Sequence, residues 1–375
     1  MSRQADPVLA VEQAGTAALS GLETEVEVAL LFATPGHASE MPRLLEAAAA
    51  HLGTRKIVGA TAHGVIGGGE ELEGGHGLVI AALSGLHAEP FLLTDLAPEA
   101  PHVADELLAR IEGGPRPEDL VVLLPDPRKV PLLSVLEDVR ERLAPAVIVG
   151  AGAADPVLDR PLQWCGRELE TGALAGVVLR GSRPPRVGVT QACRPATELM
   201  TVTRAQGHWV FELDGRPALE VYREAARGPL AEDLRRAASF VLAALPVDAA
   251  APLEPGGYLV RNVAGFAVAE QALAIPEAVV VGDRIAFVVR DPESARGDLK
   301  AMLDRMAGGT PAAALYFDCC ARGESFFGVP GLEAAYLSQA LGDTPVAGMF
   351  GSCEIGPVGG RTELLTYTGV LALIE

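Results

Sequence analysis

The sequence is short of basic residues and of long apolar runs, and both shortages exclude classes of protein. Its 375 residues include 30 Lys and Arg against 49 Asp and Glu, for a net charge of −19. Nucleic acids and anionic membranes are bound by basic surfaces, so we expect neither as a partner. No run of 18 uncharged apolar residues is present, so no membrane-spanning helix is expected. The N-terminus lacks the apolar core of a signal peptide, and we expect a cytoplasmic protein.

The sequence also lacks paired cysteines and familiar catalytic motifs. An odd number of cysteines without a CxxC pair supports neither a disulfide framework nor a structural zinc site. No GxSxG elbow or Ser/His/Asp set indicates acyl chemistry. These absences predict no metal and no catalytic residues, and they favour a binding protein over an enzyme. The five cysteines are Cys165, Cys193, Cys319, Cys320 and Cys353.

A unit that recurs three times is the main feature that is present. Each copy consists of an apolar strand, a helix, a second strand that ends in a glycine-rich corner, and a third strand. In the first copy, the first two strands should be parallel through a right-handed crossover, and the third should return antiparallel. The glycine-rich corner of the first copy, residues 64–69, is predicted to be a loop. The copies cover 29–80, 121–179 and 314–371.

The length of the chain and its apolar content of 49% predict two folded domains. We expect an α/β fold with mixed sheets built from repeated strand–helix–strand–strand units in two domains. The predicted boundaries are an N-terminal extension at 1–23 and domains at 24–216 and 217–375. Outside the repeated units, the pattern predicts a helix over 230–245 and a strand over 278–281.

Two loops of the last copy carry most of its reactive side chains. Asp318-Cys319-Cys320-Ala321-Arg322 follows the first strand, and Ser352-Cys353-Glu354 follows the second. Neighbouring parallel strands end at the same sheet edge, where ligands usually bind. A buried Glu354 needs a partner, and Arg322 is the candidate. Either this ion pair locks the two loops, or Arg322 receives a ligand carboxylate and Glu354 a ligand amine.

The thiols and one histidine leave further alternatives open. Cys319, Cys320 and Cys353 can cluster as inert packing, or the protein is an enzyme that uses Cys319 or Glu354 on a similar ligand. His63, in the glycine-rich corner of the first copy, is either a hydrogen-bonded loop residue or a haem ligand. The stretch Gly67-Gly68-Gly69 lacks the GxxxxGK[ST] pattern and leads into acidic residues, so phosphate binding is not expected there.

These motifs resemble the FIST family, whose members pair an N-terminal and a C-terminal FIST domain. The resemblance covers about 26–375 and is carried by 317–323, 345–348 and 351–357, and more loosely by 58–66. It implies a stand-alone sensory protein that binds a small ligand such as an amino acid and signals to a downstream protein. Some members look like haem-based nitric oxide sensors. The family often has Glu where this chain has Val65, which moves the expected ligand site toward the C-terminal half.

No cofactor is expected unless His63 binds haem, and the sequence does not indicate an oligomeric state. The candidate ligand-binding residues are Arg322, Glu354, Cys319, Cys320, Cys353, Thr61, His63 and Gly348.

Overall fold

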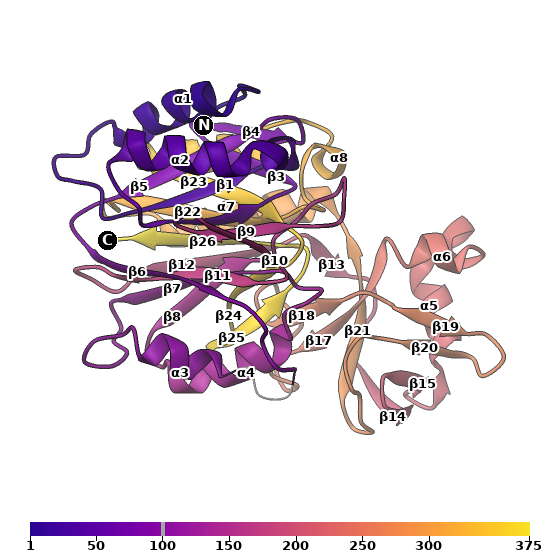
Figure 1. Cartoon of the computed structure of the whole chain (residues 1–375). Coiled ribbons are helices and arrows are strands. Elements are labelled where there is room, and N and C mark those ends of the chain that lie inside the picture. Colours follow the sequence, from indigo (N-terminus) through magenta and orange to yellow (C-terminus); the bar gives the residue numbers. More distant parts are fainter. Residues whose placement is uncertain (99–101) are drawn as a thin grey trace. The chain divides into compact units, whose positions relative to one another are not determined.

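The computed structural model describes residues 1–98 and 102–375, which form two compact units (Figure 1). The larger unit contains Met1–Val189 and Leu299–Glu375, and the smaller unit contains Thr190–Asp298. Helices and several mixed sheets make up the chain, so the expected α/β class is confirmed.

Three segments of the larger unit share one pattern of strand pairing. In each, the first strand is parallel to the second and antiparallel to the third, as predicted for the first copy. The helix between the first two strands carries buried apolar residues at helical spacing; in the first segment these include Met41, Leu44 and Ala48. The segments are β1 (Val28–Ala33), α2 (Met41–Leu52), β2 (Ile57–Thr61) and β5 (Leu78–Leu83); β7 (Asp119–Pro125), α4 (Leu132–Arg142), β8 (Val147–Ala151) and β11 (Leu174–Arg180); and β22 (Ala313–Cys319), α9 (Leu332–Leu341), β23 (Val346–Gly351) and β26 (Thr368–Ile374).

Each segment also contains a hairpin that pairs with the second strand of another segment. The hairpin of the first segment lies on β23, that of the second on β2, and that of the third on β8. The prediction of a loop at 64–69 was therefore wrong: two strands flank a turn at Gly68 and Gly69, whose φ angles of 62° and 76° favour glycine. The hairpins are β3 (Gly64–Gly67) with β4 (Glu70–Glu73), β9 (Leu162–Cys165) with β10 (Glu168–Thr171), and β24 (Glu354–Val358) with β25 (Arg361–Leu365).

Glycine recurs in the second strand of each segment because the neighbouring backbone leaves no room for a side chain. A Cβ atom on Gly59 would lie 1.8 Å from the carbonyl oxygen of Leu31 in β1. The corresponding distances are 1.9 Å for Gly150 in β8 and 2.3 Å for Gly348 in β23, again to a carbonyl oxygen of the first strand. Close approach of the two parallel strands therefore accounts for all three glycines.

Outer strands and helices complete the larger unit. β6 (His87–Leu93) extends one sheet beyond β11, and β12 (Arg186–Gln191) lies beside β26 in another. The helix α1 (Pro7–Leu19) buries Ala10, Val11 and Ala14 in a core shared with α2 and β5. The remaining helices here are α3 (Val103–Leu108), α8 (Glu324–Phe327) and the C-terminal part of α7 (Pro292–Met306).

In the smaller unit, a curved set of antiparallel strands packs against α5 (Ala218–Ala226). The helix predicted at 230–245 was wrong: it is replaced by a 3-10 turn, the short α6 (Leu234–Ala237) and a strand whose apolar run pairs on both sides. The segment 278–281 forms no strand, and Val280 and Val281 are more than 60% exposed. The strands are β13 (Cys193–Pro195), β14 (Met200–Gln206), β15 (Trp209–Leu213), β16 (Arg216–Pro217), β17 (Val241–Pro246), β18 (Tyr258–Arg261), β19 (Gly265–Ala267), β20 (Ala272–Ala274) and β21 (Arg284–Arg290).

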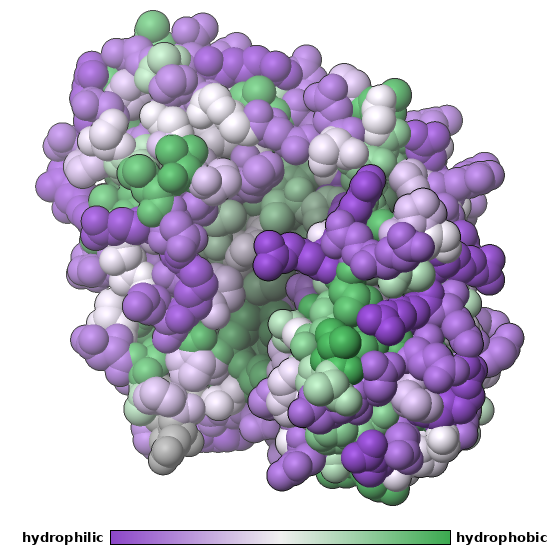
Figure 2. All heavy atoms as spheres, turned by 90° about the vertical axis from the view of Figure 1, so that its right-hand side faces the viewer, coloured by the Kyte–Doolittle hydropathy of each residue, from purple (hydrophilic) through white to green (hydrophobic). Residues whose placement is uncertain are grey.

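The surface is largely hydrophilic on the face drawn in Figure 2. Figure 2 shows one face on which hydrophilic side chains predominate and apolar side chains form smaller patches. Among the described helices, none is both long enough and apolar enough to cross a membrane.

Candidate functional site

The corners that follow β2, β8 and β23 meet in the larger unit and are joined by backbone hydrogen bonds. Because each hairpin leaves its own segment for another, the chain must cross between sheets at these corners. The bonds run from His63 N to Phe350 O (2.9 Å), from Ala154 N to Thr61 O (2.9 Å) and from Ser352 N to Gly152 O (3.0 Å). The three repeated corners thus form one continuous local structure.

A cavity of about 220 Å³ opens where these corners meet. Its polar lining comes from all three segments: His63 from the first, Arg128 and Asp155 from the second, and Cys320 and Ser352 from the third. We call this cavity the corner pocket. The structure therefore brings together two of the predicted residues, His63 and Cys320, which are 257 positions apart in the sequence.

Sequence reasoning missed Arg128, Asp155 and Ser352 as pocket residues. Arg128 follows β7 and Asp155 follows β8, so both stand just beyond the carboxyl ends of neighbouring parallel strands. That position is the signal that singled out the loops of the third segment. Applied equally to the second segment, it would have found both residues.

The corner pocket carries charges of both signs. Arg128 Nε lies 3.4 Å from Asp126 Oδ1, and its Nη1 pairs with Asp159. Asp155 Oδ1 accepts hydrogen bonds from the backbone N–H groups of Val157 (2.9 Å) and Leu158 (3.0 Å). A guanidinium and carboxylates therefore face the same opening, and these groups can bind a carboxylate and an amine, respectively.

Behind the pocket lies a buried network built on Arg322, which has no exposed surface. Its Nε lies 2.9 Å from Asp318 Oδ1, and its Nη2 pairs with Glu333 in the first turn of α9. Tyr316 Oη donates to Glu333 Oε2 at 2.9 Å. The expected ion pair between Arg322 and Glu354 was wrong: the guanidinium pairs with Asp318 through Nε and with Glu333 through Nη2.

Glu354 is also fully buried and is held by Thr368 instead. Its Oε2 accepts from Thr368 N at 3.2 Å and from Thr368 Oγ1 at 2.7 Å. Burial raises the pKa of Glu354 well above its usual range, and burial together with the charge of Glu333 does the same for the pKa of Asp318. Both carboxyls therefore favour the protonated form more strongly than exposed carboxyls do, which lessens the negative charge around the single guanidinium.

The network retains unused hydrogen-bonding capacity. Among the described residues, Asp318 Oδ2, Arg322 Nη1 and Glu354 Oε1 are buried and have no hydrogen-bond partner. Such atoms are rare in protein interiors and often mark functional positions. The structure therefore places an incompletely satisfied polar cluster next to the corner pocket.

The three clustered thiols have different environments. A hydrogen bond donated by the Cys319 thiol lowers the pKa of Cys320 and raises that of Cys319. Burial raises the pKa of Cys353. Cys320 is also the partly exposed one of the three and lines the pocket. Thiolate character and access together make it the reactive thiol of the cluster.

The remaining predicted residues lie outside the pocket lining. Thr61 Oγ1 accepts from Leu162 N at 2.9 Å and holds the start of the β9–β10 hairpin. Gly348 faces the backbone of Tyr316 in the neighbouring strand. His63, by contrast, lines the pocket, and its Nε2 lies 3.8 Å from Glu73 Oε2. Within residues 1–98 and 102–375, no group of three His, Cys, Asp or Glu side chains is arranged to hold a metal ion.

The fold and this site define an α/β protein with three interlocked units around a small pocket that is lined by both charged and apolar residues. The chain belongs to the FIST family: the model of the FIST N domain matches residues 27–216, and that of the FIST C domain matches 218–357. FIST domains are associated with sensory functions and signal transduction.

Similar proteins occur in mycobacteria. An uncharacterized protein of Mycobacterium tuberculosis is 32% identical over 357 residues, which cover 92% of this chain and 90% of that protein. An uncharacterized protein of Mycobacterium bovis is 32% identical over 376 residues, which cover 97% of this chain and 94% of that protein.

Proposed function

We propose that this chain is a cytoplasmic sensory protein that binds a small polar metabolite, such as an amino acid, in the corner pocket. The observation that carries the proposal is the meeting of Arg128, Asp155, His63 and Cys320, from three separate segments, around one cavity. Arg128 would bind the ligand carboxylate in place of Asp159, and Asp155 would bind the ammonium group. Asp159, whose side chain is 86% exposed, would be released to water, and Asp155, now held by backbone N–H groups, would gain a charged partner.

The size of the pocket favours a small ligand. Its volume of about 220 Å³ lies below the roughly 300–1,000 Å³ of pockets for drug-sized molecules. A small zwitterion fits this scale better than haem, which is the alternative that His63 raises. An enzyme acting through Cys319 or Glu354 is a weaker alternative, because both side chains are almost completely buried.

We further propose that Arg322 and Glu354 act behind the pocket and convey ligand binding to the rest of the protein. Neither side chain reaches the surface, so direct contact with a ligand would require them to leave their present partners. Cys320 joins the two regions: it lines the pocket, and it lies close enough to Glu354 and Asp318 for ionisation of either carboxyl to raise its pKa. A ligand that displaces Cys320 would change the environment of the Glu354 and Asp318 carboxyls. A downstream signalling protein would recognise this change.

A thermal-shift screen over small polar metabolites tests this function. A ligand that binds only the native state raises the melting temperature, by an amount that depends on its concentration relative to Kd. We expect at least one amino-acid-like compound to do so. Arg128→Gln and Asp155→Asn should abolish the shift while the protein remains folded.

Arg167→Gln is the matched control, because Arg167 forms an exposed ion pair with Glu46 elsewhere in the larger unit. It should leave the shift unchanged. A screen without hits would contradict the proposal. So would hits that bind the wild type and all three variants equally. A Soret band after addition of haem, lost on His63→Ala, would support the haem alternative instead.

A further inference from the structure

One of the three repeated sheets lacks an outer strand that the other two have. β6 lies beyond β11, and β12 lies beyond β26. Their counterpart in the first segment is β5, which ends the order β10-β9-β2-β1-β5. The outer edge of β5 is therefore open in the described residues, apart from an isolated pairing between Ser2 and Leu78 at one end.

The way the chain connects the three segments explains why β5 has no outer neighbour. The strand after the third strand of one segment always joins the next segment: β6 follows β5 but pairs with β11, and β12 follows β11 but pairs with β26. By the same rule, the partner of β5 would be a strand that follows β26. The described chain contains no such strand.

The open edge carries unpaired backbone groups. Gly77 O accepts from Thr34 N, and Leu78 pairs with Ser2, so odd-numbered residues of β5 face β1 and even-numbered ones face outward. The N–H and C=O groups of Ile80 and Ala82 therefore point away from β1. They have no hydrogen-bond partner in the described residues, although both residues are at most 9% exposed.

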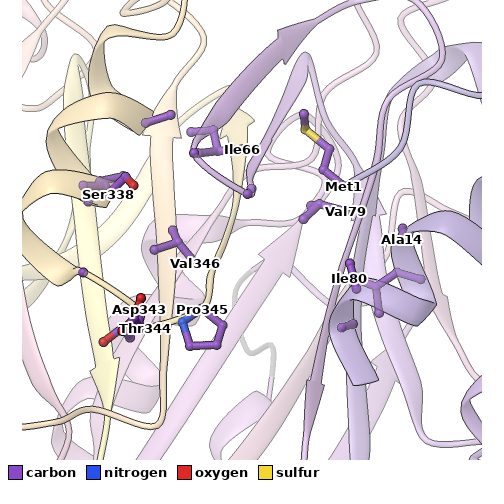
Figure 3. A pocket seen from close by; sticks show the side chains of 18 residues that line it. Met1, Ala14, Ile66, Val79, Ile80, Ser338, Asp343, Thr344, Pro345 and Val346 are labelled. Atoms are coloured by element: carbon purple, nitrogen blue, oxygen red, sulfur yellow. The ribbon is translucent and has the colours of Figure 1, made fainter. Parts of the chain in front are cut away.

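A groove runs along this edge. A cavity of about 450 Å³ is lined by residues 80–84 of the β5 edge, by residues 17–22 and by residues 345–347. It shares residues with a second cavity of about 280 Å³. Figure 3 shows Ile80 on one wall of that second cavity, with Val346, Pro345 and Asp343 across from it. The lining is mostly small and apolar, and Asp343 is the exposed charged side chain common to both cavities.

We propose that this groove binds an extended segment of a partner protein, which adds to β5 as the missing strand. The equivalent strand β6 is antiparallel to β11, which gives the expected direction. Main-chain bonds to Ile80 and Ala82 would supply the affinity, and the narrow apolar walls would select small or β-branched side chains. Asp343, in a chain with a net charge of −19, would select a Lys or Arg in the segment.

Selection from a library of randomised eight-residue peptides, with the full chain as target, tests the proposal. Ala82→Pro serves as the counter-target, because proline removes an outward N–H and is tolerated in edge strands. We expect peptides that bind the wild type at least about tenfold more tightly than Ala82→Pro. They should contain a basic residue and lose affinity on Asp343→Asn.

Two further readouts do not depend on the proline variant. Alternate amides of a bound peptide face β5, and the amides between them face away. N-methylation of the first set should abolish binding, and N-methylation of the second set should leave it intact, because only one edge of the peptide pairs with β5. Hydrogen exchange should slow at the amides of Ile80 and Ala82. Failure to enrich peptides selective for the wild type, or protection of other amides instead, would overturn the proposal.

A second copy of the chain is the competing occupant. If the wild type dimerises and Ala82→Pro is monomeric in analytical ultracentrifugation, the edge is covered by self-association, and the proposal of a partner protein is wrong.

Discussion

At the scale of single residues, the chemistry of this protein depends on which buried groups carry charge. One guanidinium, that of Arg322, is shared by Asp318 and Glu333, while Glu354 relies on Thr368. Uncompensated buried charge is costly, and this cost is the main cause of the raised pKa values of Asp318 and Glu354.

The raised pKa of Glu354 predicts outcomes of different size for two substitutions. Glu354→Gln resembles the protonated carboxyl and keeps the acceptor for Thr368, so the free energy of unfolding at pH 7 should change by less than about 1 kcal/mol. Glu354→Ala removes the acceptor and leaves a cavity, which should cost about 2–4 kcal/mol. Chemical denaturation measures both. A loss for Glu354→Gln as large as that for Glu354→Ala would mean that the carboxyl is ionised.

At the scale of elements, glycine allows the second strand of each segment to approach the first. Gly59→Ala and Gly150→Ala place a Cβ within 2 Å of a carbonyl oxygen, and Gly348→Ala places one 2.3 Å away. Because the obstacle is backbone, the sheet must shift. We expect a loss of at least about 2 kcal/mol for each variant in chemical denaturation.

Gly297→Ala is the matched control for these variants. Gly297 lies in α7, and an added Cβ would meet no atom within 4 Å. The substitution should stabilise the protein by roughly 0.5–1 kcal/mol through helix propensity. Equal effects at all four positions would contradict the close approach of the strands.

The β3–β4 hairpin caps α9 through Glu71, which makes stability depend on pH. Glu71 Oε1 accepts from Ala334 N at 2.8 Å, and burial raises the pKa of Glu71 to about 7. Since this pKa exceeds the unfolded value, the native state binds more protons between pH 4.5 and 7. The contribution of Glu71 to the free energy of unfolding therefore falls as pH rises through this window, and it is constant above it.

Glu71→Gln keeps the acceptor and removes the titration. The variant should gain stability relative to the wild type as pH increases from 5 to 8, as measured by thermal unfolding. Glu170→Gln, in the exposed strand β10 of the corresponding hairpin, should show no such trend. A constant difference between Glu71→Gln and the wild type across this range would refute the assignment.

At the scale of the whole molecule, local sequence signals predicted the segments but not their interlocking. Apolar runs and helical spacing, as in α2, marked strands and helices, and the strand ends pointed to His63 and Cys320. The exchange of hairpins, such as β3 onto β23, pairs residues nearly 300 positions apart and leaves no local pattern. The partners of Arg322 were missed for another reason: Asp318 and Glu333 are only 4 and 11 positions away, but Glu333 reaches the guanidinium only because α9 packs onto its own sheet.

The short apolar run of β17 shows a second limit. Its residues are buried as a strand between β18 and β21, but the same composition fits a buried helix. Only the neighbouring strands, which are distant in sequence, decide between the two.

The central claim, a small ligand in the corner pocket, is tested most directly by the alkylation rate of Cys320. In the free protein Cys320 should react with iodoacetamide faster than Cys165, whose pKa is raised to about 11 mainly by burial. A metabolite that raises the melting temperature should slow alkylation of Cys320 at least about tenfold at 100 times its Kd, and leave Cys165 unchanged. Stabilising metabolites that leave the rate at Cys320 unaltered would contradict the account.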